Sequence, residues 1–576
     1  MDEFHKRGEI KHELQKNIVI SILLLVLSVA AVSASDLNDN YVTELSYADD
    51  SLSIGDSLIE SSEIQSSESL STSAGTFADL QREIDNAPDG SVLNLTRNYN
   101  GQEDATVHIN KNLIIDGQGH TIDCLQECVA FTSEKGTVTL KNLNIINGYN
   151  NNWGGTAYGG ALIITGTAQY TIDNCTFKDN YADDRAGAIY HNSNGDLIIK
   201  NSIFRNNKAD DYYGGAIGVY NGNLTVYNSV FENNHANDNA GAIGFYSKGK
   251  IYIIGCSFKS NRVENNALQT YSYGGAIYSM GYNDFYIINS TFSDNYAEDY
   301  GGAVFIYFSY GNLYIDVNSS SSSSFINNCA DDNSGGAINA RCNIFAENTR
   351  FSGNYAYVDG GAVYAGEHPQ YGDDIEVCVN LKNCLFESNN AKDANSQCYG
   401  GAIHVIGDVT ADNCTFKDNF ARDYGGAIYA KNVYINRNDD IGEFSSFFIN
   451  NKAGDDKGGA IYADGGSVTI VNTVLSGNTA NVDGGAVYAD SNVNVKHCSF
   501  ESNKADGASS QCYGGAIRAV GDVTVGNCTF KDNFAHDYGG AIYAHNVFIN
   551  SNDDIGEFTS FFINNKVDDD KGGAIY

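Results

Sequence analysis

The sequence predicts an all-β solenoid, a parallel β-helix, on the evidence of two recurring motifs and the short alternating segments between them. The tetrapeptide Gly-Gly-Ala-Ile, or a close variant, recurs from Gly159 to Tyr576, with unaltered copies such as Gly214 to Ile217 and Gly400 to Ile403. The second motif, Phe-x-x-Asn, lies between these copies, for example from Phe177 to Asn180. Successive copies lie roughly 25 to 40 residues apart, a period typical of solenoid proteins.

The segments between glycines favour strands over helices. They are short, alternate as in Asp522 to Val525, and are rich in Val, Ile, Tyr, Phe and Thr. Each coil has room for two or three strands of about three to six residues, paired in parallel with the next coil about 4.8 Å away. About fourteen such coils would form a rod roughly 65 Å long.

The motif residues have distinct predicted roles. The glycine pair allows positive φ and a sharp turn without a Cβ clash. The Phe of Phe-x-x-Asn points inward and stacks on its copies, and the Asn forms a ladder of side-chain amides from coil to coil. The presence of only 2 prolines fits strands that donate hydrogen bonds to both neighbours.

The chain divides into three predicted segments. Residues 1–34 combine a basic leader, an apolar run and a small-residue cleavage pattern, which predicts a signal peptide, with an uncleaved membrane anchor as the alternative. Residues 35–75 are rich in Ser, Asp and Glu and are expected to be a flexible spacer. Residues 76–576 form the repeat domain. It begins with a helix whose Phe77, Leu80 and Ile84 cover the first coil, with Thr76 as its N-cap.

Two features of the sequence, its last residues and an internal duplication, indicate how the repeat domain is built. The sequence ends at Tyr576 on a Gly-Gly-Ala-Ile-Tyr strand without a visible cap, so we expect further sequence to follow. The segment from Cys384 to Tyr462 matches that from Cys498 to Tyr576 at an offset of 114 residues. A duplicated block of coils suits a spacer or a display surface better than a single active site.

Composition excludes some partners. The chain has 34 Lys and Arg against 71 Asp and Glu, a formal net charge of −37. Such a surface repels nucleic acid, whose binding depends on neutralising phosphates. Six of the 13 cysteines lie two residues before the Phe position and are expected to be buried thiols. A bridge between Cys384 and Cys414, or between Cys498 and Cys528, is the alternative.

Acidic side chains have three possible roles here, as catalytic, metal-binding or solvated groups. Glycoside hydrolysis needs two carboxylates around one sugar, whereas the Asp pairs here recur in many coils, as solvated turns predict. These pairs are Asp183-Asp184, Asp210-Asp211, Asp331-Asp332, Asp439-Asp440 and Asp455-Asp456. No catalytic residue is predicted, and His120 is expected to help cap the first coil. No organic cofactor is predicted. Calcium is the one candidate ion, bridging carboxylates stacked near the glycine pairs, namely Asp299, Asp423, Asp483 and Asp537.

A row of tyrosines follows the Gly-Gly-Ala-Ile motif and is predicted to face outward, because alternation places the preceding Ile inside. An outward aromatic row is a candidate binding face for sugars or a partner surface, and simple ladder stacking is the alternative. The row, here called the tyrosine strip, comprises Tyr190, Tyr278, Tyr364, Tyr429, Tyr462, Tyr488 and Tyr543.

The alternation of Gly-Gly-Ala-Ile and Phe-x-x-Asn resembles the polymorphic outer-membrane protein repeat family. With the segment Leu113 to Asp123 and the signal peptide, the chain is similar to archaeal adhesin-like proteins. The resemblance implies a right-handed β-helix with the pectin lyase-like fold, displayed at the cell surface. It also implies a non-enzymatic role, attachment to surface glycans or proteins of other cells. A membrane would be reached only through the N-terminal segment or an unseen C-terminal anchor. The alternatives are a β-helical polysaccharide lyase or glycoside hydrolase, and a purely structural wall protein.

Overall fold

The computed structural model describes residues 74–576 except 104, 152–156, 211–212, 265–270, 282, 308–310, 367–375, 394–395, 438–441, 508–510, 551–558 and 569–571. The signal peptide and almost all of the spacer that the sequence predicts lie outside the described residues. Residues Thr72–Tyr576 form one compact unit. No helix within the described part is long and apolar enough to cross a membrane.

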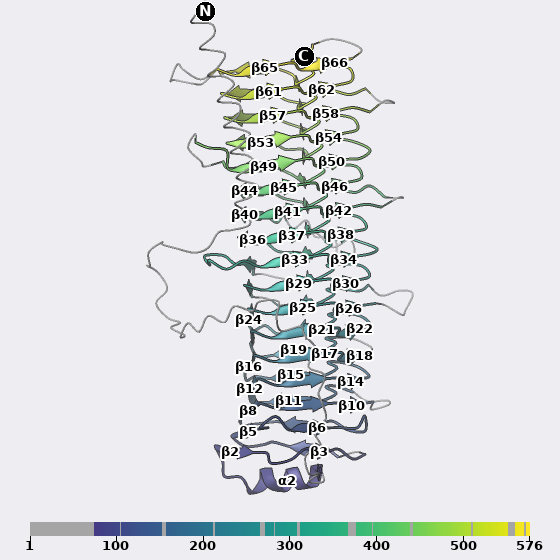
Figure 1. Ribbon diagram of the computed structural model, residues 1–576, viewed down its shortest axis with the longest axis vertical. Coiled ribbons are helices and arrows are strands. Elements are labelled where there is room, and N and C mark those ends of the chain that lie inside the picture. The colour runs from purple at the N-terminus through teal and green to yellow at the C-terminus, as the bar shows by residue number, and fades with distance from the viewer. Residues whose placement is uncertain are drawn as a thin grey trace, which may run out of the picture. The chain divides into compact units, whose positions relative to one another are not determined.

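The unit is a parallel β-solenoid, as predicted, in which each coil from β7 (Phe131–Ser133) onward contributes one strand to each of four sheets (Figure 1). One coil consists of β43 (Ile403–Val405), β44 (Val409–Asp412), β45 (Thr415–Lys417) and β46 (Phe420–Ala421). We number the sheets in this order. Within the described residues, sheet 1 has 16 strands from β4 (Val107–His108) to β63 (Ile542–Tyr543), and sheet 3 has 18 strands from β1 (Gly75–Thr76) to β65 (Phe561–Ile563).

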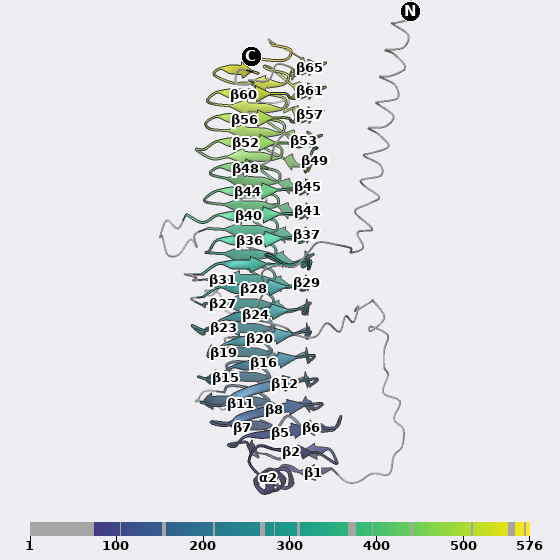
Figure 2. The same ribbon diagram turned by 90° about the vertical axis from the view of Figure 1, so that its left-hand side faces the viewer.

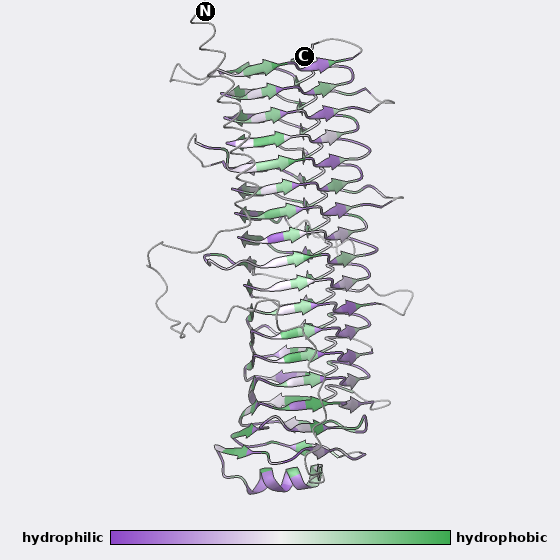
Figure 3. Cartoon of the chain, in the orientation of Figure 1, coloured by the Kyte–Doolittle hydropathy of each residue, from purple (hydrophilic) through white to green (hydrophobic). Residues whose placement is uncertain are grey.

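The other two sheets complete the coil. Sheet 2 extends from β2 (Ser91–Asn94) to β64 (Val547–Ile549) and faces the viewer in Figure 2. Sheet 4 has 15 described strands of two residues each, from β10 (Tyr149–Asn150) to β66 (Lys566–Val567). Successive copies pair in register, as Phe386 with Phe416. In Figure 3 many single strands carry both hydrophobic and hydrophilic colours, as alternation between core and solvent requires.

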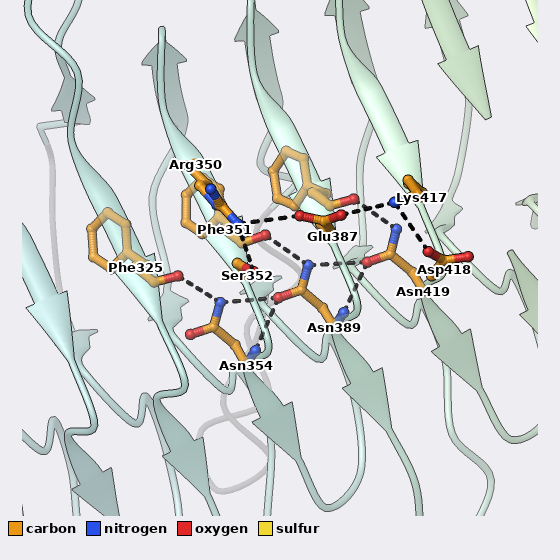
Figure 4. Close-up of polar contacts among 11 residues, drawn as sticks. Phe325, Arg350, Phe351, Ser352, Asn354, Glu387, Asn389, Lys417, Asp418 and Asn419 are labelled. Carbon is orange, nitrogen blue, oxygen red and sulfur yellow. Dashed lines mark hydrogen bonds and ion pairs between the residues drawn. The ribbon is translucent and has the colours of Figure 1, made fainter. Parts of the chain in front are cut away.

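Two predicted ladders occupy the interior. Rings of the Phe-x-x-Asn motif stack with their centroids 5.0 Å apart between Phe177 and Phe204 and 4.6 Å apart between Phe351 and Phe386. A typical motif Asn, such as Asn389, donates its amide N–H groups to the Phe carbonyl of the previous coil and to the next Asn (Figure 4). Asn180 and Asn503 donate instead to the carbonyls of Ile145 and Leu475. The ladder consists of Asn180, Asn207, Asn234, Asn261, Asn295, Asn328, Asn354, Asn389, Asn419, Asn451, Asn478, Asn503, Asn533 and Asn565.

The glycine pair has two separate functions. The first glycine has a positive φ, as at Gly425 with 61° and Gly458 with 69°, which is the conformation the sequence predicted. The second glycine, for example Gly426, does not need this conformation. A Cβ at Gly426 would overlap the carbonyl oxygen of Gly459 in the next coil. Glycine is required there because two coils approach each other closely.

The predicted capping helix is present as α2 (Phe77–Asn86), which buries Phe77, Leu80 and Ile84. Thr76 is its N-cap and forms a capping box with Asp79, since each side chain meets the other's backbone N–H. In Figure 1 the helix closes the end of the stack that carries the first coils. The helix thereby shields the edge strands from pairing with another chain.

Two details differ from the prediction. From β7 onward each coil has four strands rather than two or three. The sequence did not reveal the fourth, because the two-residue strands of sheet 4 are too short to show alternation. Sheet 1 also has 16 described strands rather than about fourteen. The additional coils lie before Gly159, where the chain lacks the glycine motif that marks a coil in the sequence.

One buried histidine gives the solenoid a testable pH response. His191 in β15 (Ile189–Ser193) lies in the core between Ile164 and Val219, and burial lowers its pKa to about 4. Because the unfolded chain binds the proton more tightly, stability is full above pH 6.5 and falls as the pH drops toward 4. This acid loss amounts to roughly 3 kcal/mol. Between pH 7.5 and pH 4.5, we expect His191→Ile to lose less free energy of unfolding than the wild type, because the buried histidine is gone. Denaturant unfolding of both proteins at the two pH values measures this difference. An equal acid loss in both proteins would contradict the assignment.

Candidate binding faces on the outside of the solenoid

The tyrosine strip lies on the outer side of sheet 1. Tyr190 is the second residue of β15, and its neighbour Ile189 is fully buried in the core. The strip points outward, as predicted, yet most of its area is covered: Tyr190, Tyr278 and Tyr488 are each 5 % exposed. Tyr364, Tyr429 and Tyr543 are half-buried.

The cover comes largely from a second aromatic row that sequence reasoning missed. Tyrosines directly before the glycine pair pack against the strip. Tyr158, for example, stacks on Tyr190 with the ring centroids 4.5 Å apart. The signal was present in the sequence, since Tyr precedes Gly-Gly in several coils. The members of this row are Tyr158, Tyr213, Tyr273, Tyr300, Tyr399, Tyr424, Tyr513 and Tyr538.

Ring faces within the strip are turned toward one another. Tyr429 and Tyr462 stack 5.0 Å apart at 10°, and Tyr462 and Tyr488 stack 4.8 Å apart at 14°. Burial and the nearby carboxylate of Asp490 raise the pKa of Tyr488, so its hydroxyl stays neutral. Stacked rings offer a ligand their edges and hydroxyls rather than their faces. This geometry fits the stabilising ladder that was the alternative interpretation.

At two positions an arginine side chain packs over a tyrosine ring of the two aromatic rows. The Arg185 guanidinium lies over the ring of Tyr158 at 5.1 Å, and that of Arg518 lies over Tyr543 at 4.3 Å. At the duplicated position, His404 takes the place of Arg518, and its ring meets Tyr429 edge-on with centroids 4.9 Å apart. The cation–π contacts of Arg185 and Arg518 stabilise the rows from within.

The four candidate calcium ligands each bond to the backbone of a neighbouring coil. Asp299 accepts the N–H of Ser272 at 2.7 Å, and Asp423 accepts that of Cys398 at 2.8 Å. Asp483 and Asp537 accept the N–H groups of Tyr513 and Cys512. Throughout the described ranges, no three or more His, Cys, Asp or Glu side chains are grouped to hold a metal ion. Calcium binding therefore stays a prediction, while the backbone bonds give these aspartates a structural role.

Asp483 offers a test between these roles. Burial raises its pKa to about 6, with Lys457 and Arg518 opposing the shift. The charged carboxylate therefore costs stability, and this cost appears as the pH rises from 3.8 through about 6. Asn can still accept the N–H of Tyr513, so Asp483→Asn is expected to raise the free energy of unfolding at pH 8 by about 1–3 kcal/mol, and not at pH 4. The same gain is expected with calcium and with a chelator. A loss seen only in calcium would establish a metal ligand.

The paired carboxylates mostly make local contacts. The hydroxyl of Tyr181 lies 2.7 Å from Asp183 and 2.6 Å from Asp210 of the next coil, and Asp455 pairs with Arg422 at 2.9 Å. Asp211, Asp439 and Asp440 lie outside the described residues. Nδ1 of His120 lies 3.2 Å from the Asn98 side chain in the coil below, in line with the expected structural role.

All thirteen cysteines are free. Burial raises the pKa of Cys175 and of Cys256 to about 12, so these thiols stay protonated and inert. Stacked coils bring Cys384 and Cys414 together, as predicted, with the backbone N–H of Cys384 donating to the sulfur of Cys414 at 3.4 Å. The thiols are thus adjacent and unbridged.

Sheet 2 carries an outward aromatic ladder that sequence reasoning also missed. Tyr252, Tyr286, Tyr314 and Phe345 lie at equivalent positions of β24 (Ile251–Ile254), β28 (Phe285–Ile288), β32 (Leu313–Ile315) and β36 (Ile344–Glu347). Their centroids are 4.8, 5.2 and 5.2 Å apart. All four rings are half-buried. An aromatic residue between two core residues, as in Ile-Tyr-Ile, was the available signal.

Two shallow grooves lie on the outer side of sheet 2. The first, about 170 Å³, is lined by Phe345, Asn380, Lys382 and Thr410 among others, and we call it the Phe345 groove. The second, about 250 Å³, is lined by Asn494, Lys496 and Thr524 among others, and we call it the Lys496 groove. The grooves contain the same Asn, Lys and Thr at the duplication offset of 114 residues.

One family model matches this chain, that of the Chlamydia polymorphic membrane protein (Chlamydia_PMP) repeat. It matches residues 348–366, 413–431, 445–464, 472–490 and 527–545. The first segment runs from the turn before sheet 3 through Phe351, Asn354 and the glycine pair to the sheet 1 strand β39 (Val363–Ala365). The matched repeat is therefore the part of the coil that contains both motifs. No curated protein sequence matches the chain.

Solved structures of alginate lyases show a distant likeness. The chain is 12 % identical to "a new PL6 alginate lyase complex with trisaccharide", covering 79 % of this chain and 82 % of that one, with a TM-score of 0.30. It is also 12 % identical to "complex structure of alginate lyase AlyF-OU02 with G6", covering 82 % of this chain and 86 % of that one, with a TM-score of 0.24.

Proposed function

We propose that the protein is a cell-surface, adhesin-like protein that attaches to glycans or proteins of other cells without chemistry of its own. The observation that carries the proposal is the repetition of outward side chains in register along the stack, as in the tyrosine strip and the sheet 2 ladder. Repeated faces suit multivalent contact with another repeated surface. The five matched polymorphic membrane protein repeats support the same role and a surface location.

The net charge of −37 supports the view that nucleic acid is not a partner. Attachment to the membrane would use the N-terminal segment or a C-terminal anchor. The tyrosine strip is the proposed adhesive face, acting through ring edges and hydroxyls.

Adhesion of beads coated with the full chain tests the proposal. The coated beads are expected to bind target cells or polysaccharide surfaces in a saturable way. A variant with Tyr364, Tyr429 and Tyr462 each changed to Phe keeps the stacked rings and removes three hydroxyls, so it should bind less if the strip is the face. Beads that bind no better than albumin-coated beads would exclude adhesion.

A parallel assay addresses the enzymatic alternative. The chain is incubated with alginate and other acidic polysaccharides, and the ultraviolet absorbance of unsaturated uronates and the reducing ends are followed. Neither signal is expected to rise. A steady rise that scales with protein concentration would favour a lyase or a hydrolase instead.

A further inference from the structure

We propose that the Phe345 groove on sheet 2 binds a single uncharged pyranose ring of a glycan chain. This inference rests on the proposed adhesive function and assigns it a site and a ligand class. The site lies on a different sheet from the tyrosine strip, so an experiment can disprove binding at one of these faces without disproving binding at the other.

The first observation is an aromatic ring with one face on which no other ring stacks. Tyr286 is stacked between Tyr252 and Tyr314, and Tyr314 between Tyr286 and Phe345, so both faces of these two rings are occupied. Phe345 is the last ring of the ladder, and its in-register neighbour on the other side is Asn380. No ring stacks on the face of Phe345 that is turned toward Asn380, and both residues line the groove. An aromatic face of this kind packs against the C–H face of a sugar ring.

The second observation is the chemistry beside that face. Asn380 supplies an amide with both donors and acceptors, and Thr410 in the next coil supplies a hydroxyl. Lys382 lies in register between Glu347 and Asp412, so the groove carries both signs of charge. A ligand of strong single charge would meet repulsion from one of these groups. Sugar hydroxyls, which donate and accept, suit this mixture.

The third observation is size. The groove encloses about 170 Å³, below the roughly 300–1,000 Å³ of sites that enclose a whole drug-sized ligand. One ring of a longer chain would occupy it, with the neighbouring sugars lying along the open sheet. Weak single sites of this kind gain strength when a polymer engages several at once.

The duplicated block supplies an internal comparison. The Lys496 groove repeats the polar trio as Asn494, Lys496 and Thr524. Thr469 stands in it where Phe345 stands in the first groove. The Lys496 groove thus keeps the hydrogen-bonding groups and lacks the aromatic platform, so it should bind neutral sugars less tightly.

The experiment measures binding of oligosaccharides to the full chain by saturation-transfer NMR and calorimetry. The neutral probes are cellohexaose, mannohexaose and chitohexaose, and hexamannuronate is the acidic comparator. At least one neutral probe is expected to bind. Phe345→Thr, which copies the residue of the Lys496 groove, and Asn380→Ala are expected to weaken it at least tenfold. The matched control Asn494→Ala should bind as wild type does. Melting curves verify that each variant is folded.

Each result decides the matter. Failure of all three neutral probes, tighter binding of hexamannuronate, or wild-type affinity in Phe345→Thr and Asn380→Ala would overturn the groove assignment. Adhesion of coated beads is measured on the same proteins. If beads coated with Phe345→Thr adhere as wild type does and the variant binds glycans unchanged, the groove is not the binding site, while the proposed adhesive function still holds. Wild-type beads that do not adhere would remove the function itself.

Discussion

Replacing Gly426 by alanine is expected to destabilise the solenoid by about 4 kcal/mol or more, or to prevent folding, although it adds a single methyl group. The added Cβ would overlap the Gly459 carbonyl oxygen in the next coil and lie 2.5 Å from the backbone nitrogen and carbonyl carbon of Lys452. These atoms belong to paired backbone, which cannot move aside without breaking the register of two coils. Overpacking against rigid neighbours is costly for this reason. Thermal unfolding and the soluble fraction on expression measure the effect.

Gly218 supplies the matched control. It lies in β19 (Ile217–Asn221) of sheet 1, paired with Tyr190 on one side and Gly244 on the other. The nearest heavy atom to an added Cβ is the Cβ of Ala186 at 3.2 Å. Because Tyr occupies the equivalent position in the neighbouring coil, Gly218→Ala should change stability by less than about 1 kcal/mol. Equal effects of the two substitutions would show that loss of glycine flexibility, and not close approach, explains the motif.

Sequence periodicity predicted the parts of the fold that repeat. The inward Phe ladder, the Asn ladder and the positive φ of the first glycine each follow from one residue type recurring in one place, as at Phe386, Asn389 and Gly400. Features that do not follow from one regularly repeated residue were not predicted. The second glycine was assigned the same turn role as the first, because a close approach between coils is a property of the stack and not of the single chain segment.

The candidate faces were harder to predict for a related reason. Alternation placed Tyr190 outside the core, which is correct, but it does not report what lies over an outward residue. Tyr158, distant by a whole coil, covers its ring. The sheet 2 ladder ends at Phe345 only because Asn380 follows in the next coil. Such features depend on register between coils, which the sequence alone leaves undetermined where loops vary in length.

Asn389→Asp is expected to be the most damaging isosteric change in the interior, and its effect should depend on pH. The Asn389 oxygen accepts the backbone N–H and the amide N–H of Asn354, at 3.1 and 2.9 Å. Its amide nitrogen donates to the carbonyl of Phe351 and to the side-chain oxygen of Asn419, at 3.1 and 3.0 Å. A carboxylate keeps the accepting oxygen, but its second oxygen replaces the amide nitrogen. That oxygen then faces the oxygens of Phe351 and Asn419, to which it cannot donate. The side chain is fully buried, so no water relieves the repulsion.

The charged variant should lose about 4 kcal/mol or more at pH 7, because two acceptors lose their donor and a charge is buried without a partner. Burial raises the pKa of such a carboxyl in the folded state, so the loss begins above the unfolded value near 3.9 and grows as the pH rises. Near pH 4 a protonated carboxyl can donate one of the two missing bonds, and part of the stability returns. Asn389→Ala should instead cost about 2–3 kcal/mol at both pH values. The exposed Asn494→Asp should cost little at either, measured by denaturant unfolding. A pH-independent loss in Asn389→Asp would mean that the ladder position is hydrated, and its closed hydrogen bonding would then not be what holds the coils in register.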